Sequence, residues 1–218
     1  MLINIGVITC PGRHYIHDTL KSLRCSFDIA PTIFNDSNRK GAMYNWLRAV
    51  ECLSGTADYL LICEDDIELR PEAAFCLRSF ILEQYDFQLE KVDIPKTSFM
   101  SLYCSLLCGR ESVLLAGGGW AKLNRLPHGW CGSLAICLPQ RSVDYVLQNR
   151  EKLIDLSMSP GGNPIHLDYA IHETLRDIGP AYAHMPTMVY HTGDVSTYSP
   201  NNTDNALLEK ARSPCLPL

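Results

Sequence analysis

The sequence contains no apolar run approaching the roughly 20 residues that a helix needs to cross a bilayer. It also has no excess of positive charge, since 19 Lys and Arg stand against 24 Asp and Glu for a formal net charge of −5. This balance argues against a dedicated nucleic-acid-binding protein, because binding to a polyanion depends on a positive field. No internal repeat and no low-complexity segment is present, which excludes solenoids and extended linkers.

A secretory signal is not visible either, because residues 1–14 have neither a basic start nor a long apolar stretch. Ten cysteines are present, but their spacing lacks the paired pattern of a zinc site. Most lie in apolar runs, as Cys10, Cys63 and Cys137 do, where a reduced cysteine packs as a small hydrophobic residue. We therefore expect free thiols and a cytoplasmic location.

The first ninety residues alternate between short apolar runs and segments with helical periodicity. Strands are predicted at 2–9, 30–34 and 58–63, and helices at 15–23, around Trp46–Leu53 and after Pro71. This order predicts an α/β fold with three layers, in which helices cover both faces of a mostly parallel sheet. At 218 residues, we expect a single domain.

The second half is less regular. We expect strands at 98–107, 112–115, 133–138 and 187–190, and helices from Pro139 to about Leu153 and from about Ile165 to Asp177. The segments 117–120 and 127–130 are expected to be loops, and the tail after Ser199 to be loosely held. These loops carry aromatic side chains suited to stacking on a sugar or a base, or simply to anchoring the loops, namely Trp120, His128 and Trp130.

The strongest chemical signal is the acidic triplet Glu64-Asp65-Asp66, which directly follows the predicted strand 58–63. Neighbouring carboxylates repel one another in a partly buried place, and a divalent cation removes that cost. Mg²⁺ and Mn²⁺ prefer oxygen ligands and usually take one or two carboxylates together with phosphate oxygens of a substrate. The triplet would also suit an acidic turn before the next helix, where carboxylates meet the positive end of the helix dipole.

Ligands of such sheets bind beyond the carboxyl ends of the strands. Three segments with candidate residues fall at these ends: 9–13, 35–40 and 64–66. We therefore expect them to surround one site.

Four segments, in the right order, resemble motifs of the nucleotide-sugar glycosyltransferases with the GT-A fold, of the family 2-like, short phage or bacterial type. LLICEDDIELRPEA is similar to the metal-binding motif, and VITCPGRHYIHDTLKSL resembles the opening strand, loop and helix. NDSNRKGAMYNWLRAV is similar to the second nucleotide-contacting loop with its helix, and PTMVYHTGDVST resembles the terminal segment with a histidine. The resemblance implies a GT-A-like, Rossmann-like sheet, with a nucleotide-sugar-binding half at 1–70, an acceptor side at 71–200 and a tail at 201–218.

The resemblance also implies a metal site. Asp66 would be the direct ligand, and Asp65 or Glu64 would contact the ribose or a metal-bound water. His191 would be the distant third ligand, unless it is an ordinary histidine at a strand end. The implied cofactor is Mn²⁺ or Mg²⁺.

Further roles concern the nucleotide. Thr9, Pro11 and Arg13 would line the base and ribose pocket, and Asp36 would contact the base. One of three cations would also offset diphosphate charge as the leaving group departs, or each would remain an ordinary solvated side chain: Arg13, Arg39 and Lys40.

Asp168 is the candidate catalytic base, because it lies in the first turn of the predicted helix 165–177, where the resembling inverting enzymes use a carboxylate. Glu173, further into that helix, is the reserve candidate. Asp168 would otherwise only interact with the helix dipole. A retaining mechanism is expected if neither carboxylate acts as base.

The sequence thus predicts a hexosyltransferase-like enzyme that transfers a sugar from a nucleoside diphosphate sugar, expected to be UDP-linked, to an acceptor hydroxyl. The acceptor would be a glycan or a hydroxymethylated base in DNA. Two other classes stay open. One is a sugar nucleotidyltransferase, although CPGRH only weakly resembles the Gly-rich loop with a basic residue that binds a triphosphate in those enzymes. The other is a non-catalytic relative that binds sugar nucleotides.

Overall fold

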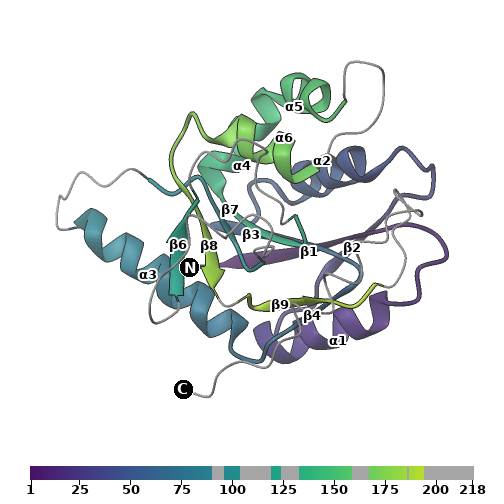
Figure 1. Ribbon diagram of the computed structural model, residues 1–218, viewed down its shortest axis with the longest axis horizontal. Coiled ribbons are helices and arrows are strands. Elements are labelled where there is room, and N and C mark those ends of the chain that lie inside the picture. Colours follow the sequence, from purple (N-terminus) through teal and green to yellow (C-terminus); the bar gives the residue numbers. More distant parts are fainter. Residues whose placement is uncertain (90–95, 104–118, 124–132, 159–166, 186, 194–218) are drawn as a thin grey trace.

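A computed structural model describes residues 1–89, 96–103, 119–123, 133–158, 167–185 and 187–193. Helices and strands alternate through the first third of the chain, as Figure 1 shows. The elements are β1 (Ile3–Thr9), α1 (Ile16–Phe27), β2 (Thr32–Asn35), α2 (Ala42–Leu53), β3 (Tyr59–Glu64), β4 (Ile67–Leu69), α3 (Ala73–Leu89), β5 (Phe99–Ser101), β6 (Gly119–Lys122), β7 (Ala135–Pro139), α4 (Gln140–Gln148), α5 (Arg150–Leu156), α6 (Leu167–Leu175), β8 (Ala181–Met185) and β9 (Val189–His191).

Seven strands form one mixed sheet in the order β2-β1-β3-β7-β5-β8-β6. The pairs β1–β2, β1–β3 and β5–β8 are parallel, whereas β7 is antiparallel to both β3 and β5, and β6 is antiparallel to β8. Five of the seven strands therefore run in one direction, which confirms the predicted mostly parallel sheet. The two strands β4 and β9 form a separate antiparallel ribbon.

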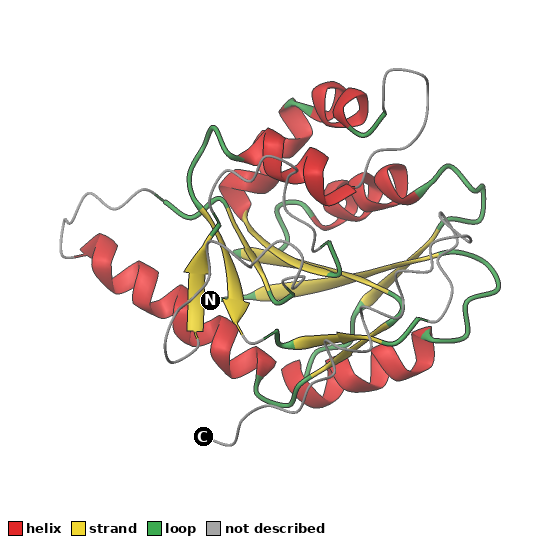
Figure 2. Ribbon diagram, in the orientation of Figure 1, coloured by secondary structure: helices red, strands yellow, loops and turns green. Residues whose placement is uncertain are grey.

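Helices cover both faces of the sheet, so the three-layer prediction is confirmed (Figure 2). Helices α2, α4, α5 and α6 pack on one face, and α1 and α3 lie on the other together with the β4–β9 ribbon. Successive residues of β3 supply both cores, because Leu60 and Ile62 face the first set of helices while Leu61 and Cys63 face the second. This two-sided burial explains why the central strands read as continuous apolar runs.

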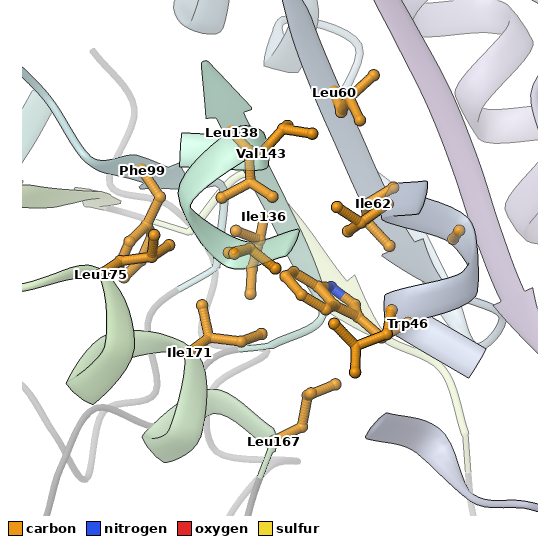
Figure 3. Close-up of a cluster of buried hydrophobic side chains, with 14 of the residues drawn as sticks. Trp46, Leu60, Ile62, Phe99, Ile136, Leu138, Val143, Leu167, Ile171 and Leu175 are labelled. Carbon is orange, nitrogen blue, oxygen red and sulfur yellow. The ribbon is translucent and has the colours of Figure 1, made fainter. Parts of the chain in front are cut away.

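The core under α2, α4 and α6 is built around Trp46, whose side chain is fully buried. Figure 3 shows Trp46 and Ile171 pointing from their helices toward Ile136 on β7. Buried aromatic and aliphatic side chains of this kind each contribute about 1.5–3 kcal/mol relative to exposure. The predicted packing of Cys63 and Cys137 as small hydrophobic residues is confirmed, since both are buried.

The structure departs from the sequence-based expectations in four places. The predicted helix 139–153 is interrupted at Asn149, whose backbone is not helical (φ −110°, ψ 25°) and whose amide donates to the carbonyl of Tyr145 at 2.9 Å. The strands β4 and β8 were not predicted, because β4 has only three residues and β8 lacks the continuous apolar run that marks β1 and β3. Trp120, expected on a loop, lies in strand β6.

Trp120 anchors β6 to α3. Its ring stacks on Phe80 with centroids 4.7 Å apart, and its indole nitrogen donates to the carbonyl of Cys76 at 3.3 Å. These contacts agree with the anchoring role that the sequence left open beside stacking on a ligand.

Several expectations fall outside the described residues: the predicted strand residues 104–107 and 112–115, the loop with His128 and Trp130, and the tail 201–218. In the part of the chain that the structure describes, no helix combines the length and apolar character required to span a membrane.

Candidate functional site

The carboxyl ends of β1 and β3 meet at one edge of the sheet, because the two strands are parallel neighbours. A cleft with about 520 Å³ of empty space, partly open to solvent, lies at this edge. We call it the acidic cleft, and it is lined by Ile8, Thr9, Cys10, Arg13, Ala42, Asn45, Glu64, Asp65, Asp66 and His191. The structure thus brings the acidic triplet together with the loop after β1 and the predicted histidine.

The acidic turn between β3 and β4 is buried: Asp65 is 4% exposed and Asp66 is 3% exposed. The side chain of Thr19 on α1 fixes this turn through contacts with its backbone. Its hydroxyl oxygen lies 2.8 Å from the carbonyl oxygens of Asp65 and Ile67, and it accepts a hydrogen bond from the Ile67 amide at 3.0 Å. Because the turn is fixed to a helix through its backbone, the two carboxylates are pre-positioned.

Arg13 forms ion pairs with both buried aspartates. Its Nε and Nη2 atoms donate to Asp65 Oδ1 at 3.2 and 3.0 Å, and Nη2 also donates to Asp66 Oδ2. The hydroxyl of Thr9 donates to the other oxygen of Asp65. The carboxylates are thereby neutralised and oriented by the loop that follows β1.

His191 reaches Asp66 because of the register of the β4–β9 ribbon. Ile67 pairs with His191, and the amide of Thr192 donates to the carbonyl of Asp66 at 2.8 Å. His191 Nε2 consequently lies 3.2 Å from Asp66 Oδ2. Gly193 completes the enclosure, since a Cβ atom at this position would overlap the Asp66 carboxylate.

The surroundings of the acidic turn shift the pKa values of Glu64 and Asp66 in opposite directions. Burial and the charge of Asp66 raise the pKa of Glu64 to about 7, although the hydrogen bond from Ser133 Oγ at 2.7 Å acts in the opposite direction. Burial alone would raise the pKa of Asp66, but the hydrogen bond and charge of His191, with the charge of Arg13, hold it below its usual range. Asp66 is therefore held in its ionised form more firmly than Glu64.

The same contact acts on the imidazole. Burial by itself would lower the pKa of His191, but the hydrogen bond and charge of Asp66, and the charge of Glu64, raise it above its usual value. His191 and Asp66 thus stabilise each other's charged form.

The loop after β2 is organised by Asp36. Its carboxylate accepts backbone hydrogen bonds from Lys40 at 2.9 Å and Gly41 at 2.8 Å, which caps the approach to α2. Asn45 on α2 then ties β1 to β2, because its amide nitrogen donates to the carbonyls of Thr9 and Phe34 at 3.1 and 2.7 Å. Asp36 thus organises the loop before α2, but it is not among the residues that line the acidic cleft.

Besides Asp36, three other predicted nucleotide contacts do not line the acidic cleft. Pro11, Arg39 and Lys40 are all exposed. Arg39 has a left-handed backbone with φ 51°, a conformation that costs a non-glycine residue about 1 kcal/mol.

The two candidate bases differ in their surroundings. Asp168 is 6% exposed, and it is near enough to the cleft for its negative charge to contribute to the raised pKa of Glu64. Glu173 instead forms an ion pair with Arg176, which directly follows α6. Of the two, Asp168 is therefore the one whose charge acts on Glu64.

A partial cation site is present on Asp66. Its Oδ1 atom is buried and has no hydrogen-bond partner among the described residues. Within those residues, no three His, Cys, Asp or Glu side chains are arranged as a complete metal-binding group. One orphaned carboxylate oxygen beside a second aspartate suits a hard cation that takes most of its ligands from a diphosphate and water.

Four supporting residues were not identified from the sequence: Thr19, Asn45, Ser133 and Gly193. Each acts through a contact between segments distant in the chain, such as the 69 residues that separate Glu64 from Ser133. Only Gly193 carried a signal, as the residue two positions after the predicted His191.

No protein-family model matches the chain, and no curated protein is significantly similar to it in sequence. Among solved structures, the fold resembles A197 from STIV with a TM-score of 0.53, 14% sequence identity, and coverage of 88% of this chain and 87% of that one. At this identity the likeness shows the fold alone.

Two further solved structures are less similar. The glycosyltransferase GlyE of Streptococcus pneumoniae TIGR4 has a TM-score of 0.45 and 11% identity, over 83% of this chain and 45% of that one. A putative glucose-1-phosphate thymidylyltransferase from Bacillus anthracis has a TM-score of 0.44 and 9% identity, over 98% and 78% of the two chains. TM-scores under 0.5 carry no weight in assigning an activity, so the function must be argued from the site.

Proposed function

We propose that the protein is a glycosyltransferase that moves a sugar from a nucleoside diphosphate sugar to an acceptor hydroxyl with the help of a divalent cation. One observation carries the proposal: two buried aspartates directly follow strand β3 inside a cleft, and one oxygen of Asp66 has no hydrogen-bond partner among the described residues. A buried, ionised carboxylate with an unsatisfied oxygen is costly unless a ligand completes it.

Asp66 would hold the cation, with Asp65 beside it and His191 completing the site from β9. Mn²⁺ or Mg²⁺ bound there would neutralise the charge that develops on the leaving diphosphate. Arg13 adds a guanidinium at the same edge of the sheet, suited to phosphate oxygens. The end of β1 and the start of α2 form the wall nearest the nucleoside, where Thr9, Cys10 and Ala42 line the cleft.

Asp168 is the proposed base that takes the proton from the acceptor hydroxyl. Its burial beside the acidic cleft supports this role, because a partly desolvated carboxylate is a stronger proton acceptor than one in water. A base at this position implies an inverting reaction. The donor that we propose is a UDP-linked hexose, the acceptor is the hydroxyl of a glycan or of a hydroxymethylated base in DNA, and the location is the cytoplasm.

The test is a panel of nucleoside diphosphate sugars, incubated with and without Mn²⁺ and with both acceptor types, in which release of nucleoside diphosphate is measured. We expect release only with the cation, and a loss of at least about a hundredfold in Asp66→Asn. Glu68→Gln is the matched control, because Glu68 lies two residues further along, is exposed and does not line the cleft. Near-normal turnover by folded Asp66→Asn would rule out this mechanism.

A further inference from the structure

The loop after β1 places a positive charge against the candidate metal ligand. The side chain of Arg13 is only 11% exposed, and those of Asp65 and Asp66 are 6% and 4% exposed. Arg13 Nη2 donates to both carboxylates at once, and Nε adds a second bond to Asp65. Such a fork of charge-assisted bonds is stronger than ordinary hydrogen bonds and fixes the guanidinium between the two acids.

The two aspartates need this neutralisation, because an isolated buried carboxylate is strongly destabilised. Arg13 forms ion pairs with both aspartates, whereas His191 contacts only Asp66. In the structure, Arg13 therefore supplies the charge balance that the proposed function assigns to a divalent cation.

The two cations compete for the same carboxylate. Asp66 Oδ2 is bonded to Arg13 and lies 3.2 Å from His191, which leaves only Oδ1 without a hydrogen-bond partner among the described residues. A divalent ion on Asp66 would sit within a few ångströms of the guanidinium charge, and like charges at that distance repel strongly where water is excluded.

Resting on the proposed function, we propose that Arg13 is the resident counter-cation of Asp65 and Asp66, and that a divalent ion binds only by displacing its guanidinium. The released guanidinium is then available to the phosphate oxygens of the donor in the same cleft. Metal alone consequently binds weakly, because it must displace the guanidinium of Arg13. Metal and nucleoside diphosphate bind cooperatively, because the metal releases the guanidinium and the phosphate oxygens then bind it.

The experiment measures Mn²⁺ binding without any donor or acceptor, from the electron paramagnetic resonance signal of the free ion. Arg13→Gln removes the competing charge and is expected to tighten Mn²⁺ binding at least tenfold relative to the unaltered protein. Arg13→Lys keeps a charge but loses the fork that spans both acids, so we expect an intermediate affinity. Arg24→Gln, on exposed α1 surface, makes the same change in net charge and should bind Mn²⁺ like the unaltered chain.

Circular dichroism first establishes which variants are folded. If Arg13→Gln unfolds without metal, Arg13→Lys carries the test and must still bind Mn²⁺ more tightly than the unaltered chain. A second readout is thermal unfolding, where Mn²⁺ should raise the midpoint of the folded Arg13 variants more than that of the unaltered chain. Equal or weaker Mn²⁺ affinity in the folded Arg13 variants overturns the inference.

This outcome is separable from failure of the proposed function. A chain that releases nucleoside diphosphate with Mn²⁺ while all variants bind Mn²⁺ equally keeps the glycosyltransferase assignment and loses the role of Arg13. Tighter Mn²⁺ binding in the variants, with no donor turned over by the unaltered chain, supports the competition and removes the enzyme assignment.

Discussion

Gly193→Ala is the change that most directly tests how Asp66 is held. Gly193 follows β9 and approaches Asp66 so closely that an added Cβ would overlap the carboxylate and lie 3.0 Å from Asp66 Cβ and Cγ. Neither side can yield easily, because the Asp66 carbonyl is bonded to Thr192 and its side chain to Arg13 and His191. The methyl group must therefore displace the carboxylate or the end of β9.

The expected magnitude follows from this geometry. Forcing one methyl group into a packed site costs about 1–3 kcal/mol of unfolding free energy. A displacement of about 1 Å in a group that positions reacting atoms lowers the rate by about a hundredfold. We thus expect a modest loss of stability with a large loss of nucleoside diphosphate release per folded molecule.

The assay combines urea unfolding with donor turnover under Mn²⁺, and Gly55→Ala serves as the control. Gly55 has a left-handed backbone with φ 71° and no atom within 4 Å of an added Cβ, and it lies before β3, at the end opposite the acidic cleft. Gly55→Ala should lose about 1–2 kcal/mol through backbone strain but keep its turnover. If Gly193→Ala were as active per folded molecule as Gly55→Ala, the reasoning about Asp66 would be refuted.

Three other predictions use side chains around the site and in the core. Asp168→Asn should lower kcat by about 10²–10⁴ while donor affinity measured by calorimetry is unchanged, and Glu173→Gln should stay near normal; the reverse ranking would reassign the base. Burial lowers the pKa of His172 in the folded chain. As pH drops below about 6.5, this histidine therefore takes up a proton in the unfolded chain before it does so in the folded chain. The free energy of unfolding should then fall, by at most about 1.4 kcal/mol per pH unit. His172→Gln should lack that part of the slope in urea titrations at pH 5 and pH 7, and identical slopes would contradict the assignment. Thr19→Val leaves the backbone of Asp65 and Ile67 without its partner and should cost about 1–3 kcal/mol of unfolding free energy, a reading that an unchanged urea midpoint would exclude.

The fold of the first ninety residues was predictable because its signals are local. Apolar runs in β1 and β3 and helical spacing in α1 and α2 are each set by neighbours in sequence, and the alternation fixed the parallel order of β1, β2 and β3. Two strands were not predicted, β4 within these ninety residues and β8 in the second half, since each forms by pairing with a distant partner, Ile67 with His191 and Ala181 with Phe99. The break at Asn149 depends on a side chain that bonds its own helix, which periodicity does not detect.

The sequence by itself determined where the acidic triplet lies, because three carboxylates after an apolar strand must emerge at the carboxyl end of a buried sheet. It also placed Thr9 and Arg13 at the same edge, since parallel strands end together. Only the tertiary structure decided that Arg13 bonds both aspartates, that the ribbon register carries His191 to Asp66, and that Asp36, Arg39 and Lys40 stay outside the cleft. These outcomes depend on distances between side chains from separate elements, and residue types and spacing along a chain do not specify such distances.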